Sequence, residues 1–275
     1  MLTGMPRTTV AAVGSLAAFA AVAAGLWWRE RAARPGPGER PLVVYAAAAV
    51  RVPLEAAAGE YEPETGRRVE LRFGASEDVL TKSGLVNPSD PADLFLPADD
   101  SYVRLAQARG LVGDRIPLAT MRAVVLTPPG NPKGVAAWPD LLRDGVRVAV
   151  PNPGAAVGKL TRDHLTATGR WAALAPRVVD TGTVTEAANA AKLGSVDAAV
   201  VWDAVAAGYR GQAALALPEL AGVTGRVEVA VLAQSADPAA ALRFARYLAD
   251  PGRGLKTFRA AGFAVVEPAA SGGVK

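Results

Sequence analysis

The sequence predicts an α/β fold in which mostly parallel strands are flanked by helices. Three observations predict it: short apolar runs typical of buried strands, intervening segments of about 10 residues with helical spacing, and small or polar residues at their junctions. Strands joined through helices run parallel, because a parallel pair needs a long crossover connection. With 275 residues, of which 51% are hydrophobic and 20% charged, the chain can form one large domain or two small ones.

The expected elements follow one another from residue 42 onward. Residues 42–48 are a continuous apolar run, as expected for a strand buried on both faces, and residues 50–61 have helical spacing that stops before Pro63 and Gly66. The other expected strands are 69–73, 93–96, 122–126, 146–150, 177–179, 198–201 and 228–233. The other expected helices are 76–82, 101–109, 157–168, 184–193, 204–208, 238–249 and 254–260. In such sheets, ligands bind at the carboxyl ends of the strands, near helix N-termini.

A hydrophobic segment precedes these elements. Val10 to Trp28 is an uninterrupted run of apolar or small residues that spans roughly 28 Å as a helix, near the hydrocarbon thickness of a bilayer. For residues 1–31 we weigh a cleaved signal peptide, favoured by sites such as Ala18-Phe19-Ala20, against an uncleaved membrane anchor, favoured by the length and the terminal Trp pair. Residues 32–41 form a Pro/Gly linker. We expect an extracytoplasmic, periplasmic domain that this segment exports or anchors to the membrane.

The composition argues against several classes of function. Five of the 30 basic and two of the 26 acidic residues lie in residues 1–40, which leaves about +1 of the net charge of +4 for the remainder. A nucleic-acid binder would concentrate basic residues on its folded domain, so we expect no nucleic-acid partner. The absence of cysteine excludes thiolate metal sites, and His164 is the single histidine. We expect His164 to be a surface or helix-capping residue and expect no metal site.

Catalytic motifs are missing as well. The sequence contains no glycine-rich nucleotide-binding loop, no nucleophile elbow and no zinc-protease motif. The adjacent carboxylates Asp99 and Asp100 follow an expected strand, where such residues cap the next helix more often than they catalyse a reaction. We therefore expect that the protein is not an enzyme and uses no cofactor.

Four expected strand-to-helix turns consist mainly of small and hydroxyl residues. They are 46–49, 73–76, 152–158 and 181–184. In the last of them, Thr183 and Glu186 have the spacing of a capping box. Small side chains let backbone N–H groups approach a ligand, and helix N-termini favour negative charge. Each turn alone is ordinary for an α/β protein, but several that converge would bind an anion without a charged side chain.

Several segments occur in the order of the motifs of a known family. They are 43–48, 61–66, Trp138 with Leu141-Leu142, Asn152-Pro153, 199–202, and Phe258 with Gly262-Phe263. The most specific one, Pro91-Ala92-Asp93-Leu94-Phe95-Leu96-Pro97-Ala98-Asp99, is close to the family's Pro-Ala-Asp-(Val/Leu)-Phe-Ile-Ser-Ala-Asp. Together they resemble the periplasmic molybdate-binding proteins of ABC transporters, over residues 42–265.

The resemblance implies a two-lobed, type II periplasmic-binding fold with a ligand cleft between the lobes. One lobe would comprise residues 42–121 and 226–275, and the other residues 122–225. The lobes would close on the ligand, and an ABC permease would recognise the closed form; we expect the protein itself to be a monomer. The ligand contacts carried over from the family are Ala49, Ser76, Val157, Val184 and Trp202.

Two of these positions depart from the family pattern. The family has a serine where this chain has Ala49, which removes a hydroxyl donor but keeps the backbone amide. It has a tyrosine where this chain has Trp202, whose indole N–H can only donate. A lost hydrogen bond to a charged ligand costs about 1.5–3 kcal/mol. The resemblance therefore predicts the fold more firmly than the ligand.

The favoured function is capture of molybdate or a similar tetrahedral oxyanion, tungstate or with less support sulfate, for an ABC importer. Such an oxometalate would be bound as an anion, without protein ligands to its metal atom. Phosphate is disfavoured, because a protonated phosphate needs a hydrogen-bond acceptor. The open alternatives are a membrane-tethered sensor or non-transporting remnant of the same fold, a binding protein for another small solute, and, with least support, an enzyme on this fold.

Overall fold

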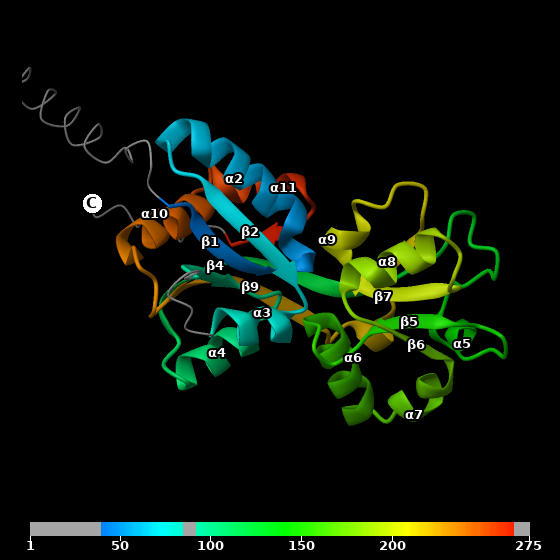
Figure 1. Cartoon of the computed structure of the whole chain (residues 1–275). Coiled ribbons are helices and arrows are strands. Elements are labelled where there is room, and N and C mark those ends of the chain that lie inside the picture. Colours follow the sequence, from blue (N-terminus) through cyan, green and yellow to red (C-terminus); the bar gives the residue numbers. More distant parts are fainter. Residues whose placement is uncertain (1–39, 85–91, 267–275) are drawn as a thin grey trace, which may run out of the picture.

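Two lobes lie side by side in the computed structural model, each with a sheet and surrounding helices (Figure 1). The structure describes residues 40–84 and 92–266. The predicted signal peptide or anchor (1–31) lies outside the described residues, as does the predicted linker except for Arg40 and Pro41.

The elements alternate along the chain as predicted. The described strands are β1 (Leu42–Ala47), β2 (Val69–Gly74), β3 (Leu94–Leu96), β4 (Val112–Leu126), β5 (Val148–Pro151), β6 (Val178–Thr181), β7 (Ala198–Trp202), β8 (Ala214–Leu215), β9 (Thr224–Leu232) and β10 (Ala264–Val265). The described α-helices are α2 (Arg51–Thr65), α3 (Ser76–Ser83), α4 (Asp100–Ala108), α5 (Trp138–Leu141), α6 (Ala156–Ala167), α7 (Trp171–Leu174), α8 (Val184–Lys192), α9 (Asp203–Ala206), α10 (Pro238–Leu248) and α11 (Gly254–Ala260). Short 3-10 helices are η1 (Ala48–Val50), η2 (Ala175–Arg177) and η3 (Pro218–Leu220).

Strand β4 belongs to both lobes. Up to Arg122 it pairs with β9, and from Ala123 onward it pairs with β7. The described strands follow the order β2-β1-β3-β9-β4-β7-β5-β6, with β8 and β10 also paired to β4. We call the part built on β1, β2, β3, β9 and β10 lobe 1, and the part built on β5 to β8 lobe 2. The chain crosses between the lobes along β4 and returns at β9, where the N–H of Ala123 donates to the carbonyl of Val223 at 3.0 Å.

The sheet is mixed, with its parallel pairs where helices connect the strands. Strand β1 pairs in parallel with β2 and β3, and β5 pairs in parallel with β6 and β7. The pairs that involve β4 or β9 are antiparallel. These two strands run directly between the lobes in opposite directions, so no crossover helix imposes a parallel arrangement on them.

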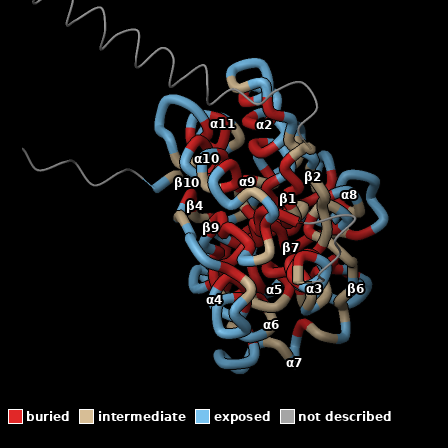
Figure 2. Tube along the Cα trace, turned by 60° about the vertical axis from the view of Figure 1, so that its left-hand side comes forward, coloured by how far each residue is buried: buried red, intermediate tan, exposed pale blue. Residues whose placement is uncertain are grey.

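Buried residues gather in the interior of each lobe (Figure 2), and most of them are apolar. In lobe 1, Leu42 and Val44 of β1 are completely buried, and so are Phe244 of α10 and Phe258 of α11. Helices α2, α10 and α11 lie on one side of the lobe 1 sheet, and α3 and α4 lie on the other (Figure 1). Both faces of the sheet are therefore covered, which explains the continuous apolar run that β1 shows in the sequence.

A buried carboxylate fixes the beginning of lobe 1. Asp93 is fully buried and accepts hydrogen bonds from the Arg40 guanidinium at 2.6 and 2.9 Å, from the Val43 N–H at 2.9 Å and from the Ser235 hydroxyl at 2.6 Å. A buried charge is tolerated when it is paired in this way. Residue 40, where the described chain begins, is thereby held at the amino end of β1.

Some elements differ from the sequence prediction. Strand β4 starts at Val112 rather than at residue 122, because long-range pairing with β9 outweighs the low strand propensity of Gly113 and Pro117. Helix α2 continues through Pro63 to Thr65 and ends at Gly66, which has a left-handed φ of 77°. His164 lies in the last turn of α6 and is half-buried. Its Nε2 lies 3.1 Å from the carbonyl oxygen of Glu219 and its ring packs against Gly222, and its role as a surface or capping residue stays a prediction.

Candidate functional site

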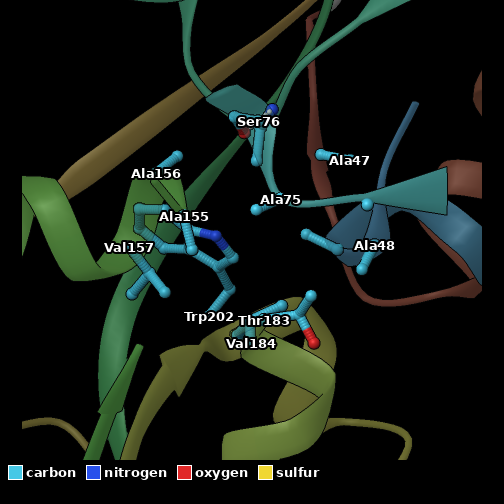
Figure 3. Close-up of a pocket in the computed structure, with 13 residues that line it drawn as sticks. Ala47, Ala48, Ala75, Ser76, Ala155, Ala156, Val157, Thr183, Val184 and Trp202 are labelled. Carbon is cyan, nitrogen blue, oxygen red and sulfur yellow. Dashed lines mark hydrogen bonds between the residues drawn. The ribbon is translucent and has the colours of Figure 1, made fainter. Parts of the chain in front are cut away.

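A pocket lies between the two lobes (Figure 3). Its lining residues are Ala47, Ala48, Ala49, Gly74, Ala75, Ser76, Ala98, Ala155, Ala156, Val157, Thr183, Val184 and Trp202. Those up to Ala98 come from lobe 1, and those from Ala155 onward come from lobe 2. The space that these residues enclose is small, with a cavity volume of about 10 Å³. A small solute held there would contact both lobes at once.

The helices η1, α3, α6 and α8 all begin at this pocket. Their N-cap residues, Ala47, Ala75, Ala155 and Thr183, have extended backbone conformations. The three alanines make no side-chain capping hydrogen bond. Since the first N–H groups of a helix have no partner within the helix, these turns present backbone donors, and the positive ends of the helix dipoles, to the pocket.

Ser76 adds a hydroxyl donor at the start of α3. Its side chain is almost completely buried, and its Oγ accepts a hydrogen bond from the backbone N–H of Ala98 at 3.3 Å. The hydroxyl hydrogen of Ser76 is not used in that bond and is available to a ligand in the pocket. The same residue therefore offers a hydroxyl donor and, as the first residue of α3, a backbone N–H.

Trp202 supplies the large side chain of the pocket. It ends β7, pairs with Ala123 of β4 where the chain crosses between the lobes, and is 1% exposed. In Figure 3 its ring lies between Ala155 and Val157 of the α6 start and Val184 of the α8 start. An indole offers an N–H donor and no acceptor, which suits a ligand that only accepts hydrogen bonds.

Three apolar lining residues bring backbone groups rather than polar side chains. Ala49 lies in η1, Val157 is the second residue of α6 and Val184 is the first residue of α8. The start of α6 is packed closely on the end of β5, because a Cβ on Gly158 would lie 1.9 Å from the carbonyl oxygen of Pro151. Only glycine at residue 158 permits this approach, which holds the first turn of α6 at the pocket.

Among the residues that the structure describes, no ionisable side chain lines the pocket. Of the three carboxylates that directly follow lining residues, Glu77 lies beside Gly154, and the other two accept from backbone donors. Asp99 accepts from the Ser101 N–H at 3.0 Å, and Asp203 accepts from the N–H groups of Ala204 at 2.8 Å and Arg122 at 3.1 Å. The predicted role of Asp99 as a helix cap is confirmed. The electrostatic character of the pocket therefore comes from oriented backbone dipoles and neutral donors.

Direct hydrogen bonds join the lobes beside the pocket. The Glu77 N–H of lobe 1 donates to the Gly154 carbonyl of lobe 2 at 3.0 Å. The Tyr102 hydroxyl lies 3.4 Å from the carbonyl oxygens of Pro153 and Gly154. Burial, together with the nearby Glu77 carboxylate, raises the pKa of the Tyr102 hydroxyl, so it stays a protonated donor. Beside these contacts, the lining residues from Ala98 to Trp202 are buried except for Thr183, which is partly exposed.

The structure brings all five sequence-predicted site residues to this one pocket. They are Ala49, Ser76, Val157, Val184 and Trp202. Their role as ligand contacts stays a prediction. Sequence reasoning did not single out Ala98, although it follows β3 much as Ala48 and Ala75 follow β1 and β2. The position of a small residue after a buried strand was the signal that could have found it.

Residues 40–84 and 92–266 contain neither a candidate metal cluster nor a helix that could span a membrane. No cluster of three or more His, Cys, Asp or Glu side chains suited to a metal ion occurs there. No helix in these ranges has both the length and the apolar character to cross a membrane.

Comparison with known proteins assigns the fold to a family. Residues 42–264 match the family model described as bacterial extracellular solute-binding protein. This chain belongs to that family. The chain is also 31% identical over 216 residues, 77% of its length and 80% of the relative's, to the molybdate-binding protein ModA of Mycobacterium tuberculosis. The predicted resemblance to the periplasmic molybdate-binding proteins of ABC transporters is thereby confirmed.

Solved structures support the two-lobed fold. The periplasmic molybdate-binding protein of Azotobacter vinelandii superposes with a TM-score of 0.67 at 23% identity, covering 83% of this chain and all of that one. A periplasmic thiamin-binding protein superposes with a TM-score of 0.71 at 17% identity, covering 87% and 88%. The fold is thus common to proteins described with different ligands, and similarity of fold alone does not identify the solute.

Family membership settles two of the broader predictions. Solute-binding proteins of ABC transporters are not enzymes, so the prediction that this chain is not an enzyme is confirmed. The family is described as extracellular, which agrees with the predicted extracytoplasmic location. Whether residues 1–31 act as a signal peptide or as an anchor stays a prediction, because they lie outside the described residues.

Proposed function

We propose that this protein captures molybdate or a similar tetrahedral oxyanion, such as tungstate, and delivers it to an ABC permease. The observation that carries the proposal is the convergence of the starts of η1, α3, α6 and α8 on a small pocket without an ionisable lining residue. Helix N-termini attract anions through unpaired N–H groups and the helix dipole. The molybdate-binding relative described above supports the same class of ligand.

The chemistry of the donors narrows the ligand further. Ser76 and Trp202 can both donate to the ligand, and the lining backbone of Val157 and Val184 lies in first helical turns whose N–H groups point out of the helix. A ligand held by donors alone should carry no proton that needs an acceptor, which disfavours phosphate. A cation such as thiamin would face the positive ends of several helix dipoles, which is unfavourable. A fully ionised tetrahedral anion satisfies both conditions.

The remaining parts of the proposal concern the whole chain. The ligand contacts would be Ala49, Ser76, Val157, Val184 and Trp202. Lobe 1 would comprise residues 42–121 and 226–275, and lobe 2 residues 122–225, with closure around the anion producing the form that the permease recognises. The protein would act as a monomer, exported or anchored by residues 1–31.

Calorimetric titration of the full-length chain with molybdate, tungstate, sulfate and phosphate tests the proposal. We expect tight binding of molybdate or tungstate and much weaker binding of sulfate and phosphate. If none of the four anions produces a binding signal, the oxyanion assignment is rejected. In that case a protein for another small solute, or a non-transporting remnant or sensor with this fold, would be the better description, and the missing hydroxyl at Ala49 would support the remnant.

A further inference from the structure

A glycine outside the pocket lies against two of its lining residues. Gly225 is in β9, where it pairs with Met121 of β4, and Trp202 of β7 pairs with Ala123 of the same strand. Strand β4 therefore brings Gly225 of lobe 1 and Trp202 of lobe 2 together at the point where the chain crosses between the lobes. A strand conformation suits any residue, so the need for glycine here must come from space.

The space beside Gly225 is occupied by two residues that line the pocket, Ala98 and Trp202. A Cβ on Gly225 would lie 2.6 Å from the carbonyl oxygen of Ala98, and 3.0 and 3.1 Å from Cη2 and Cζ2 of the Trp202 ring. The first distance is too short for any side chain to be added without movement of the Ala98 backbone. The other two are at the limit of close packing, so the ring would have to shift as well.

Neither neighbour can move freely. The turn that contains Ala98 is held to β9 by a long hydrogen bond, at 3.4 Å, from the Arg226 N–H to Asp99, and the Ala98 N–H donates to the Ser76 hydroxyl. Trp202 is 1% exposed, so its ring has no route outward into solvent. A side chain at residue 225 would push it toward the pocket and would disturb the Ala98 backbone that orients Ser76.

We infer that Gly225 is a positioning residue that sets the distance between Ala98 of lobe 1 and Trp202 of lobe 2, and thereby the size and affinity of the anion pocket. The inference rests on the proposed function. It adds a residue that does not touch the ligand but determines how Ser76 of lobe 1 and Trp202 of lobe 2 meet the ligand. The glycine acts by leaving a space that the indole ring occupies.

A double-mutant cycle on the full-length chain tests this, with molybdate as the probe. Gly225→Ala should lower the affinity at least about tenfold, because the new methyl group would displace the Ala98 backbone and the Trp202 ring at the pocket. Trp202→Tyr removes the ring atoms that a new Cβ would meet and keeps a hydroxyl donor. In the Trp202→Tyr background, the loss caused by Gly225→Ala should be at least about threefold smaller, which is more than the deviation expected for independent sites.

Gly113→Ala is the matched control. Gly113 also lies in a strand of lobe 1, and a Cβ there would meet nothing within 4 Å. This variant should bind molybdate as the wild type does. A purely structural role for Gly225 predicts a lower melting temperature with the affinity of the folded protein unchanged, so both quantities are measured for every variant.

The results of these measurements either support or overturn the role proposed for Gly225. Unchanged affinity in Gly225→Ala, or losses that are additive in the cycle within about twofold, would overturn the inference. If Gly225→Ala does not fold, recovery of folding in the double variant supports the inference, and failure to recover overturns it. If the wild type binds none of the four anions, the proposed function fails first. Binding by the wild type with no effect of Gly225→Ala removes only the inference.

Discussion

Helices α4 and α10 complete their first turns differently from η1, α3 and α6, which begin at the pocket. At α4 and α10, Asp99 and Asp237 cap the helix, accepting from the N–H groups of Ser101 and Ala240, each at 3.0 Å. The N-caps of η1, α3 and α6 are alanines, which cannot accept. Alanine at an N-cap is less stable than aspartate by about 1 kcal/mol. The pocket-facing turns thus forgo stability that the other two helices obtain.

For the proposed anion ligand, this difference indicates where the binding energy would come from. An N–H group that is not used by a capping side chain is available to an anion, and several such groups in a shielded pocket replace the charged residues that the site lacks. Helix α8 is intermediate, because Thr183 accepts from the Glu186 N–H at 3.2 Å while also lining the pocket. Its Glu186 carboxylate accepts from the Gly182 N–H at 2.8 Å, so the predicted capping box closes one residue earlier than the standard form.

The largest effect is expected when an N-cap side chain is introduced at the start of α3, in the pocket. In Ala75→Asp, a carboxylate would accept from the first N–H groups of α3 and place a negative charge beside the ligand. We expect molybdate affinity to fall at least about a hundredfold, because like charges in a desolvated site cost several kcal/mol, while the melting temperature does not fall. Calorimetry and thermal unfolding measure both. The neutral cap Ala75→Asn should lose less affinity, and equal losses for Asp and Asn would contradict the electrostatic explanation.

Removal of one donor should have a smaller effect. Ser76→Ala should weaken oxyanion binding about tenfold or more, since a hydrogen bond to a charged ligand contributes about 1.5–3 kcal/mol, and the fold should remain intact. Ser83→Ala is the control, because Ser83 is equally buried in the same helix but donates to the Leu80 carbonyl at 3.0 Å. Calorimetric titration of both variants with molybdate compares their affinities. An unchanged affinity in Ser76→Ala would show that the site is misplaced.

A cap outside the pocket should matter for stability alone. Asp237→Ala should destabilise the protein by at least about 1 kcal/mol through the lost cap of α10, and further because Asp237 lies 3.3 Å from the buried Arg67 guanidinium. Asp237→Asn keeps a capping oxygen and isolates the loss of charge. Denaturant unfolding gives the free energies. Molybdate affinity should be the same in both variants and in the wild type, and a tenfold change would refute the separation of roles.

The smallest effect should be that of pH. No lining residue titrates, and the raised pKa of Tyr102 keeps its interlobe hydroxyl protonated well above neutral pH. The affinity for a fully ionised anion should therefore change less than about twofold between about pH 7 and 9. Titrations at several pH values in that range provide the test. A steep dependence would indicate that an ionisable side chain reaches the ligand.

The sequence predicted the elements near the pocket better than those that join the lobes. The turns 46–49, 73–76, 152–158 and 181–184 were recognisable because small residues directly follow local strand patterns. The first ten residues of β4 were not, since Gly113 and Pro117 disfavour a strand and only pairing with a segment a hundred residues away compensates. The close contact of Gly225 with Ala98 and Trp202 has no local signature for the same reason.

The shared strand β4 also determines the order in which the molecule can assemble. Lobe 2 is a continuous stretch between the outgoing β4 and the returning β9, whereas the lobe 1 sheet lacks β9 and β10 until the end of the chain has been made. During synthesis, lobe 2 can therefore complete most of its contacts before β9, which pairs with both β3 and β4, has been made. The pocket needs Ala98 from lobe 1 and Trp202 from lobe 2, so it is among the last features of the protein to form.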